Sequence, residues 1–290
     1  MTIPAVASYP LPTASEFPVS KVKWALQPAR AVLLVHDMQD YFLRFYGDDS
    51  PLKTALIANL AALCTWARAH GVPVVYTAQP VEQSRQDRAL LNDMWGPGLT
   101  TADPALAAVS GPLAPQPGDT VLTKWRYSAF QRSNLQDLMQ QWGRDQLLIG
   151  GVYAHIGCLM TAVEAFMRDI QPFMVGDAVA DFSADEHAMA LRYVAGRAGR
   201  VVATAEVLAA GRAPLTWDAF KASVLAQLPE LQAELAAEDN LLDHGLDSVQ
   251  VMELVSAWAR QGVKVRFEDL AREPSLNAWW QVLTKAEAAA

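Results

Sequence analysis

The sequence predicts an α/β protein with a doubly wound, mainly parallel six-stranded sheet and helices on both faces, followed by a small four-helix bundle. Its length of 290 residues suits one medium domain and one small domain. Over the first two hundred residues, short β-branched apolar runs alternate with longer amphipathic stretches, a pattern typical of βα units. Strand-like runs stop after Val207, and only helical patterns continue. We therefore expect an α/β domain over residues 1–209, a linker over 210–215 and a helical domain over 216–290.

Six apolar runs are the expected strands of the sheet. They cover residues 31–36, 72–79, 120–124, 146–150, 172–175 and 200–204. Between the first two, leucines recur at helical spacing ahead of Gly71, which favours the end of a helix there. Ser133 is the expected N-cap of a later helix that carries Leu135, Leu138 and Trp142 on one face and ends at Gly143.

The linker is predicted from a run of small residues around Gly211 that has no periodic apolar face. Beyond it, amphipathic helices are expected over residues 217–235, 248–261 and 275–283. Pro229 should kink or end the first of these helices.

Composition excludes several classes of function. A net charge of -8 argues against nucleic acid, which needs a concentrated basic face. No apolar run reaches the roughly 20 residues that span a bilayer, and the first residues lack a signal-peptide pattern, so we expect a cytoplasmic protein with no membrane partner.

Cys64 and Cys158 are expected to be buried, small hydrophobic residues rather than a disulfide. The five histidines lack the close spacing of zinc ligands, so no metal is expected.

Polar residues follow several of the predicted strands. Asp37 and Gln39 follow the first, Gln79 ends the second, Lys124 ends the third, and Tyr153 follows the fourth. Ligands of parallel α/β sheets bind at the carboxyl ends of the strands. An acid, a lysine and a glycine-rich turn therefore converge at one edge of the sheet.

These residues lie in long segments that resemble the isochorismatase branch of the cysteine-hydrolase superfamily. The segments cover residues 36–42, 76–80, 90–98, 124–130 and 151–157. The resemblance implies that Gly157 occupies the position of the superfamily's nucleophilic cysteine. Cys158 is one residue further, about 100° around a helix, so it should point elsewhere. Covalent thiol catalysis is thereby disfavoured.

The resemblance implies hydrolysis of the vinyl ether of isochorismate by acid catalysis, with Asp37 and Lys124 as catalytic residues. Asp37 would protonate the terminal methylene of the enolpyruvyl group. It would have to stay protonated near neutral pH, which burial against Phe42 and Trp95 favours by raising its pKa. Lys124 would oppose this protonation electrostatically, and its implied role is to bind substrate carboxylates rather than to deliver the proton. The implied substrate-binding residues are Gln39, Phe42, Gln79, Arg88, Trp95, Tyr153 and Gly157, and the Val152 to Ala154 turn resembles one with a non-proline cis peptide in this superfamily.

The segment from Asp239 to Val249 resembles the modification site of acyl and peptidyl carrier proteins, with Ser248 as the attachment point for 4'-phosphopantetheine. A serine at a helix N-terminus is also an ordinary N-cap. The face with Val249, Met252 and Val255 is the expected docking surface. Sequence does not call for Mg²⁺, although a magnesium ion on this domain is compatible with it.

The whole chain thus resembles bifunctional isochorismatase/aryl carrier proteins of catecholate siderophore biosynthesis and nonribosomal peptide synthesis. The implied partners are isochorismate, a phosphopantetheinyl transferase, an aryl-adenylating 2,3-dihydroxybenzoate-AMP ligase and a downstream condensation-domain synthetase, and the resemblance implies a homodimer. Two alternatives stay open, namely a cysteine-dependent amidase or nicotinamidase, and a non-catalytic carrier scaffold.

Overall fold

The computed structural model describes residues 3–109, 111–211, 215–228, 235–260, 263 and 265–288. They form two compact units, Met1–Ala210 and Gly211–Ala290. Residues 212–214 of the expected linker, and Pro229 with its expected kink, lie outside the described residues. Across the described ranges, no helix is long and apolar enough to cross a membrane.

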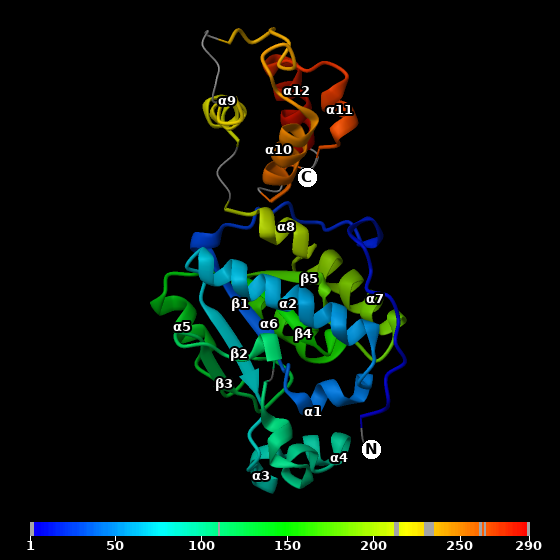
Figure 1. The fold of residues 1–290 in the computed structure, drawn as a ribbon. Coiled ribbons are helices and arrows are strands. Elements are labelled where there is room, and N and C mark those ends of the chain that lie inside the picture. The colour runs from blue at the N-terminus through cyan, green and yellow to red at the C-terminus, as the bar shows by residue number, and fades with distance from the viewer. Residues whose placement is uncertain are drawn as a thin grey trace. The chain divides into compact units, whose positions relative to one another are not determined.

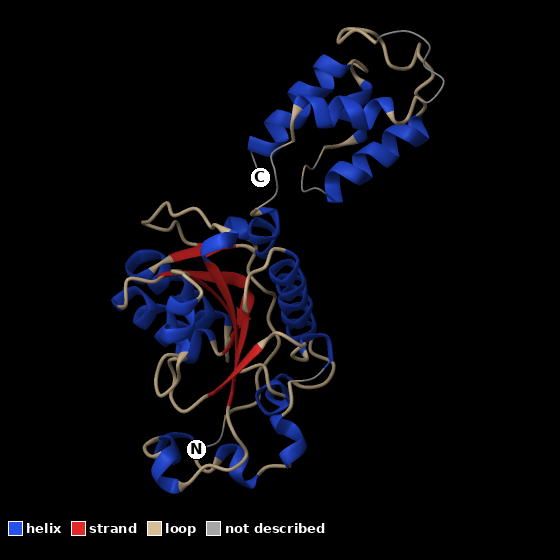
Figure 2. Cartoon of the chain, turned by 90° about the vertical axis from the view of Figure 1, so that its left-hand side faces the viewer, coloured by secondary structure: helices blue, strands red, loops and turns tan. Residues whose placement is uncertain are grey.

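The first unit is a doubly wound sheet of six parallel strands in the order β3-β2-β1-β4-β5-β6. Figure 2 shows the strands between two layers of helices. The strands are β1 (Ala31–His36), β2 (Val74–Ala78), β3 (Thr120–Thr123), β4 (Gln146–Val152), β5 (Gln171–Ala180) and β6 (Arg200–Val202). The predicted parallel sheet of six strands is confirmed.

The helices of this unit cover both faces of the sheet (Figure 1). One apolar core includes side chains from α2 and α8, and the other includes side chains from α5, α6 and α7. Short helices near the site complete the unit. The bounds are α1 (Asp40–Leu43), α2 (Pro51–Ala69), α3 (Arg85–Arg88), α4 (Leu91–Trp95), α5 (Leu135–Gln141), α6 (Leu159–Met167), α7 (Ala184–Tyr193) and α8 (Thr204–Ala209).

Three local expectations for this unit are wrong. Ser133 is not the N-cap of α5, because Asn134 occupies that place, and the Ser133 hydroxyl donates to the carbonyl of Ala129 at 2.5 Å. Strand β5 runs to Ala180 rather than Val175, since its second half pairs with the end of β4 beyond an irregularity in register. Thr204 begins α8 instead of ending β6, and its N–H and hydroxyl both donate to Asp177.

The second unit contains α9 (Trp217–Leu225), α10 (Ser248–Arg260), α11 (Phe267–Ala271) and α12 (Leu276–Ala288). The helix expected over residues 217–235 ends at Leu225. The core of the second unit holds Phe220, Trp258 and Trp279, all at most 1% exposed. Both indoles are satisfied, since Trp258 donates to the Ser223 hydroxyl and Trp279 to the carbonyl of Leu270. The expected four-helix domain is confirmed.

Candidate functional site

The candidate site lies where β1, β2, β3 and β4 end, because parallel strands bring their carboxyl ends to one edge. Asp37 follows β1, Gln79 follows β2 and Lys124 follows β3. Tyr153 follows β4, after a cis peptide bond between Val152 and Tyr153. The convergence predicted from the strand ends is thus present in the fold.

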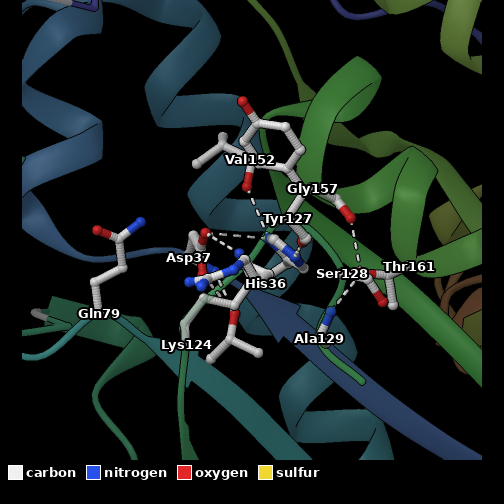
Figure 3. Close-up of polar contacts among 12 residues, drawn as sticks. His36, Asp37, Gln79, Lys124, Tyr127, Ser128, Ala129, Val152, Gly157 and Thr161 are labelled. Carbon is white, nitrogen blue, oxygen red and sulfur yellow. Dashed lines mark hydrogen bonds and ion pairs between the residues drawn. The ribbon is translucent and has the colours of Figure 1, made fainter. Parts of the chain in front are cut away.

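A buried ion pair joins Asp37 to Lys124 at the centre of the site (Figure 3). Lys124 Nζ donates to Asp37 Oδ2 at 2.8 Å, and the Thr77 hydroxyl donates to Asp37 Oδ1 at 2.6 Å. The side chains of Asp37 and Lys124 are 9% and 4% exposed. The backbone of Asp37 has a φ of 50°, an uncommon conformation for a residue other than glycine that its N–H bond to the Thr77 hydroxyl helps to hold. The carboxylate is therefore held in one place.

The protonation state of Asp37 differs from the expectation. Burial by itself raises the pKa of this carboxyl, but the charge of Lys124, a smaller electrostatic contribution from His36, and the hydrogen bonds from Lys124 and Thr77 together outweigh burial and hold the pKa below its usual value. Asp37 is thus a carboxylate in the ligand-free protein. The two opposing effects expected from the sequence, burial and the charge of Lys124, are both present, and the carboxylate prevails because hydrogen bonds from Lys124 and Thr77 add to the attraction of the lysine.

A pocket of about 580 Å³, including its open mouth, surrounds this ion pair. Eight of the nine residues that the sequence predicts for this site line the pocket: Asp37, Phe42, Gln79, Arg88, Trp95, Lys124, Tyr153 and Gly157. One side of the pocket is aromatic, since the rings of Tyr153 and Phe182 are 4.4 Å apart and those of Trp95 and Phe182 are 6.2 Å apart. The other groups are polar, and the pocket therefore suits a flat apolar ring that carries anionic groups.

Arg88 supplies a buried positive charge to the pocket. Its guanidinium donates to the carbonyl of Gly96 at 2.7 Å and to the amide oxygens of Gln83 and Gln79 at 3.2 and 3.4 Å. All three acceptors are neutral, and burial lowers its pKa. Among the residues that the structure describes, no carboxylate pairs with Arg88. It is therefore suited to bind the carboxylate of a ligand.

Gln39 does not line the pocket. Its side chain is fully buried, with the amide nitrogen donating to the carbonyls of Gln79 and Ala107 and the amide oxygen accepting from the N–H of Gln79. Because every one of these bonds is to backbone, Gln39 fixes the position of Gln79 instead of presenting its own amide to a ligand.

Cys158 has no access to the pocket. It is fully buried in the core between the sheet and α6, and burial raises the pKa of its thiol well above the usual range. Gly157, the residue before it, lines the pocket. The geometry leaves the site without a thiolate, which is the form of cysteine that acts as a nucleophile. Cys64 is likewise buried.

In addition to the N-terminal Ile3, sequence reasoning missed seven residues that line the pocket, namely Tyr41, Leu91, Arg126, Tyr127, Val152, Ile156 and Phe182. Tyr41, Tyr127 and Ile156 lie inside the matched segments, so their position was available as a signal. Phe182 lies just after the end of β5 at Ala180. Because the predicted strand ended at Val175, Phe182 was not recognised as a residue at the carboxyl end of a strand. Ile3 also lines the pocket, from an N-terminal segment that carries no signal in the sequence.

One group of potential metal ligands occurs within the described ranges. It comprises His155, Asp181 and Glu186, and sequence spacing did not suggest it. His155 Nδ1 and Asp181 Oδ1 are 2.6 Å apart and bind each other, and a second Asp181 oxygen accepts from the backbone of His155. These contacts account for the group as a structural ion pair.

In the second unit, Ser248 is the first residue of α10 and is exposed. Asp247 caps this helix, since its carboxylate accepts from the N–H of Gln250 while the Gln250 side chain accepts from the N–H of Asp247. The ordinary capping role is therefore filled by Asp247, and the Ser248 hydroxyl makes no hydrogen bond to the described part of the chain. Beside it, Val249 and Met252 are 65% and 50% exposed, whereas Val255 packs against the core.

Comparisons with known proteins agree with both units. The isochorismatase domain model matches residues 31–206, and the phosphopantetheine attachment site model matches residues 218–283. The chain is 53% identical to enterobactin synthase component B of Escherichia coli over 285 residues, 98% of this chain and 99% of that protein. It is 47% identical to the isochorismatase of Bacillus subtilis, over 98% of this chain and 96% of that protein.

Solved structures support the fold of the first unit. A cysteine hydrolase from Pseudomonas syringae pv. phaseolicola matches with a TM-score of 0.59 and 26% identity, over 66% of this chain and 95% of that one. An isochorismatase family protein from Burkholderia thailandensis matches with a TM-score of 0.57 and 25% identity, over 67% of this chain and 97% of that one. The chain therefore belongs to the isochorismatase family and carries a phosphopantetheine-binding carrier domain behind the isochorismatase domain.

Proposed function

We propose that the first unit hydrolyses isochorismate to 2,3-dihydro-2,3-dihydroxybenzoate and pyruvate, and that the second carries an activated aryl acid as a thioester for nonribosomal siderophore synthesis. The observation that carries the first half is the buried Asp37–Lys124 pair in a pocket that has no thiolate. The observation that carries the second half is the exposed Ser248, which begins α10 directly after the capping residue Asp247. The relatives named isochorismatase and enterobactin synthase component B support both.

In this proposal Asp37, once protonated, delivers a proton to the terminal methylene carbon of the enolpyruvyl group. The ether oxygen then stabilises the cation as an oxocarbenium ion, and water adds to the same carbon that bears the ether oxygen. Loss of a proton leaves a hemiketal. The bond between the hemiketal carbon and the ether oxygen of the ring then breaks. The hemiketal hydroxyl loses its proton as the keto group of pyruvate forms, and the ring oxygen takes up a proton to become the alcohol. No covalent bond to the protein is needed.

Asp37 must gain a proton before it can act as this acid, because its pKa is depressed in the ligand-free protein. Isochorismate carries two carboxylates. Binding one of them beside Lys124 neutralises the positive charge that holds Asp37 ionised, and both carboxylates add negative charge to the pocket. Both effects raise the pKa of Asp37. We infer that substrate binding is coupled to proton uptake by Asp37.

The substrate-binding roles follow from the lining of the pocket. Arg88 is the proposed partner of one carboxylate, and Lys124 the partner of the other. The aromatic side with Tyr153, Trp95 and Phe42 is proposed to hold the cyclohexadiene ring. Gln79 is proposed to donate or accept a hydrogen bond at a ring hydroxyl, with Gln39 as the residue that positions it.

Phosphopantetheine fits the second unit at Ser248. The hydroxyl is exposed at the N-terminus of a helix of 13 residues, where free backbone N–H groups favour an anion. When attached, the group supplies a flexible arm whose terminal thiol holds the aryl acid. Val249 and Met252 are the proposed contacts for the phosphopantetheinyl transferase, the aryl-adenylating ligase and the downstream synthetase. The cytoplasmic location and the homodimer predicted from the sequence stay predictions.

The two alternatives are weaker. A cysteine-dependent amidase or nicotinamidase needs a thiolate in the pocket, but Gly157 has no side chain and Cys158 is buried in the core. A non-catalytic scaffold would have no reason to keep a carboxylate and a lysine buried together, because burying two charges costs several kcal/mol that a packed apolar pair would not.

The two halves of the proposal are tested with full-length wild type, Asp37→Asn and Ser248→Ala, incubated with isochorismate and, separately, with coenzyme A and a phosphopantetheinyl transferase. We expect Asp37→Asn to lose at least about a hundredfold in pyruvate release, since an amide cannot deliver the proton, and to gain the mass of the arm normally. Ser248→Ala should release pyruvate normally and gain no mass. Wild-type pyruvate release by Asp37→Asn, or modification of Ser248→Ala, would contradict the respective half.

A further inference from the structure

Gly157 lies at the edge of the pocket directly against the imidazole ring of His36 (Figure 3). A Cβ atom at position 157 would lie 2.1 Å from Cε1, 2.8 Å from Nε2 and 3.0 Å from Nδ1 of this ring. Carbon atoms in contact normally stay about 3.5 to 4.0 Å apart. The backbone of Gly157 is not in the left-handed region, so its own conformation does not call for glycine. The three nearest atoms that a side chain at this position would meet all belong to the ring of His36.

The ring of His36 is held in place. His36 ends β1 and is fully buried. Its Nδ1–H donates to the carbonyl of Val152 at 2.9 Å, and Nε2 lies 3.3 Å from the carbonyl of Tyr127. Burial lowers the pKa of His36 to about 4, so the ring is neutral at physiological pH. A ring bonded to the end of β4 and packed on all sides cannot swing away as an exposed side chain could.

Position 157 also faces the reactive part of the pocket. Asp37, Lys124 and Gly157 line the same cavity, and His36 Nδ1 is 3.6 Å from Asp37 Oδ2. A side chain at 157 would therefore stand beside the ion pair, where a substrate must bind. His36 and Gly157 are 121 residues apart in the sequence. The steric conflict between the imidazole and a side chain at position 157 is therefore visible only in the fold.

We propose that His36 and Gly157 form one specificity determinant, in which the imidazole fills the volume that any side chain at 157 would need and so keeps a nucleophile out of the pocket. His36 is then a positioning residue rather than a catalytic one. A single Gly157→Cys exchange would not supply a usable thiol, because the ring already occupies its place. Admitting one requires a change at His36 as well.

A double-mutant cycle in the full-length protein tests this coupling. The substitutions are Gly157→Ala, which adds only the Cβ, and His36→Asn, which removes Cε1 and Nε2 but keeps an amide donor for the Val152 carbonyl. We expect Gly157→Ala to lower kcat/KM for pyruvate release about tenfold or more in the wild-type background, and less than about twofold in the His36→Asn background. An equal loss in both backgrounds would overturn the proposal.

The melting temperature of the first unit, measured on the same four proteins, gives a second readout. It should fall on Gly157→Ala only when His36 is present. The activity readout rests on the proposed function, but the melting temperatures do not. If wild type released no pyruvate, the proposed function would be refuted, and the melting temperatures would still test the coupling between His36 and Gly157.

Gly196→Ala is the matched control, because a Cβ there meets nothing within 4 Å and the backbone is not left-handed. It should change neither readout. If Gly157→Ala alone does not fold, a folded double variant with the melting temperature of His36→Asn supports the proposal, and a double variant that also fails to fold overturns it. His36→Ala serves as the background if asparagine is not tolerated.

Discussion

Replacing Lys124 by methionine should destabilise the first unit strongly, because it leaves the carboxylate of Asp37 buried without its cation. Lys124 Nζ is 2.8 Å from Asp37 Oδ2, and both side chains are at least nine-tenths buried. Breaking a buried ion pair on one side typically costs about 3 to 5 kcal/mol. For a unit of about 200 residues, 1 kcal/mol corresponds to roughly 2 to 4 °C, so the melting temperature should fall by about 6 to 20 °C at pH 7.

The pH dependence of this loss carries more information than its size. In wild type the folded pKa of Asp37 is depressed, so its stabilisation is present above the unfolded pKa of about 3.9 and is lost as pH falls through the folded pKa. In Lys124→Met burial dominates and the folded pKa is raised. The variant therefore gains stability as pH falls, and the gap to wild type should narrow from pH 7 toward pH 4.

Scanning calorimetry of the full-length protein between pH 4 and pH 8 measures this gap, with the transition of the second unit as an internal reference. Lys53→Met is the matched control. Its ammonium lies 3.6 Å from Asp48, whose carboxylate is fully exposed, and exposed pairs contribute less than about 1 kcal/mol. A Lys124→Met protein that melts within about 3 °C of wild type, or a gap that is the same at pH 5 and pH 8, would refute the buried ion pair.

Three further predictions concern activity. Arg88→Met should raise KM for isochorismate by about tenfold or more with a smaller effect on kcat, as steady-state pyruvate release will reveal, because a charged hydrogen bond to a carboxylate is worth about 1.5 to 3 kcal/mol. Cys158→Ala should keep pyruvate release within about twofold while lowering the melting temperature by a few degrees, and turnover lost with the fold intact would restore thiol chemistry. A pH series should show kcat/KM falling as pH rises from 6 to 8, since the free enzyme must gain a proton on Asp37 whose pKa is depressed, and a flat or rising profile would remove Asp37 as the acid.

The sheet and the meeting of its strand ends were predictable because both follow from local pattern. Strand β1 is apolar from Ala31 to Val35, as a strand covered on both faces requires. Once the strands are parallel, Asp37 and Lys124 must lie at one edge although 87 residues separate them. The exposed serine was predictable for the same reason, since the carrier motif is continuous in sequence.

Features that depend on long-range packing were not predictable. Gly176 and Asp177 look like a turn, yet β5 continues through them because Asp177 accepts from Thr204 and its carbonyl from Asn59. Helix α11, with five residues, is too short to show helical periodicity. Gln39 looks like a ligand residue, and only the fold shows that its amide is fully used by backbone groups.

The protonation state of Asp37 was the hardest feature to predict from the sequence, because it depends on the balance of large opposing effects on the pKa. Burial favours the acid, whereas the charge of Lys124 and the hydrogen bonds from Lys124 and Thr77 favour the carboxylate, and only the folded contacts show which effect prevails. In the proposed mechanism, the same lysine that makes Asp37 a poor acid before substrate binds is also the binding site for a substrate carboxylate. A neutral enol ether would leave Lys124 paired with Asp37 and the acid ionised. On the proposed mechanism, an anionic enol ether competes for the lysine and allows the carboxyl to take up its proton, so the pocket would select its substrate by charge at the step that creates the acid.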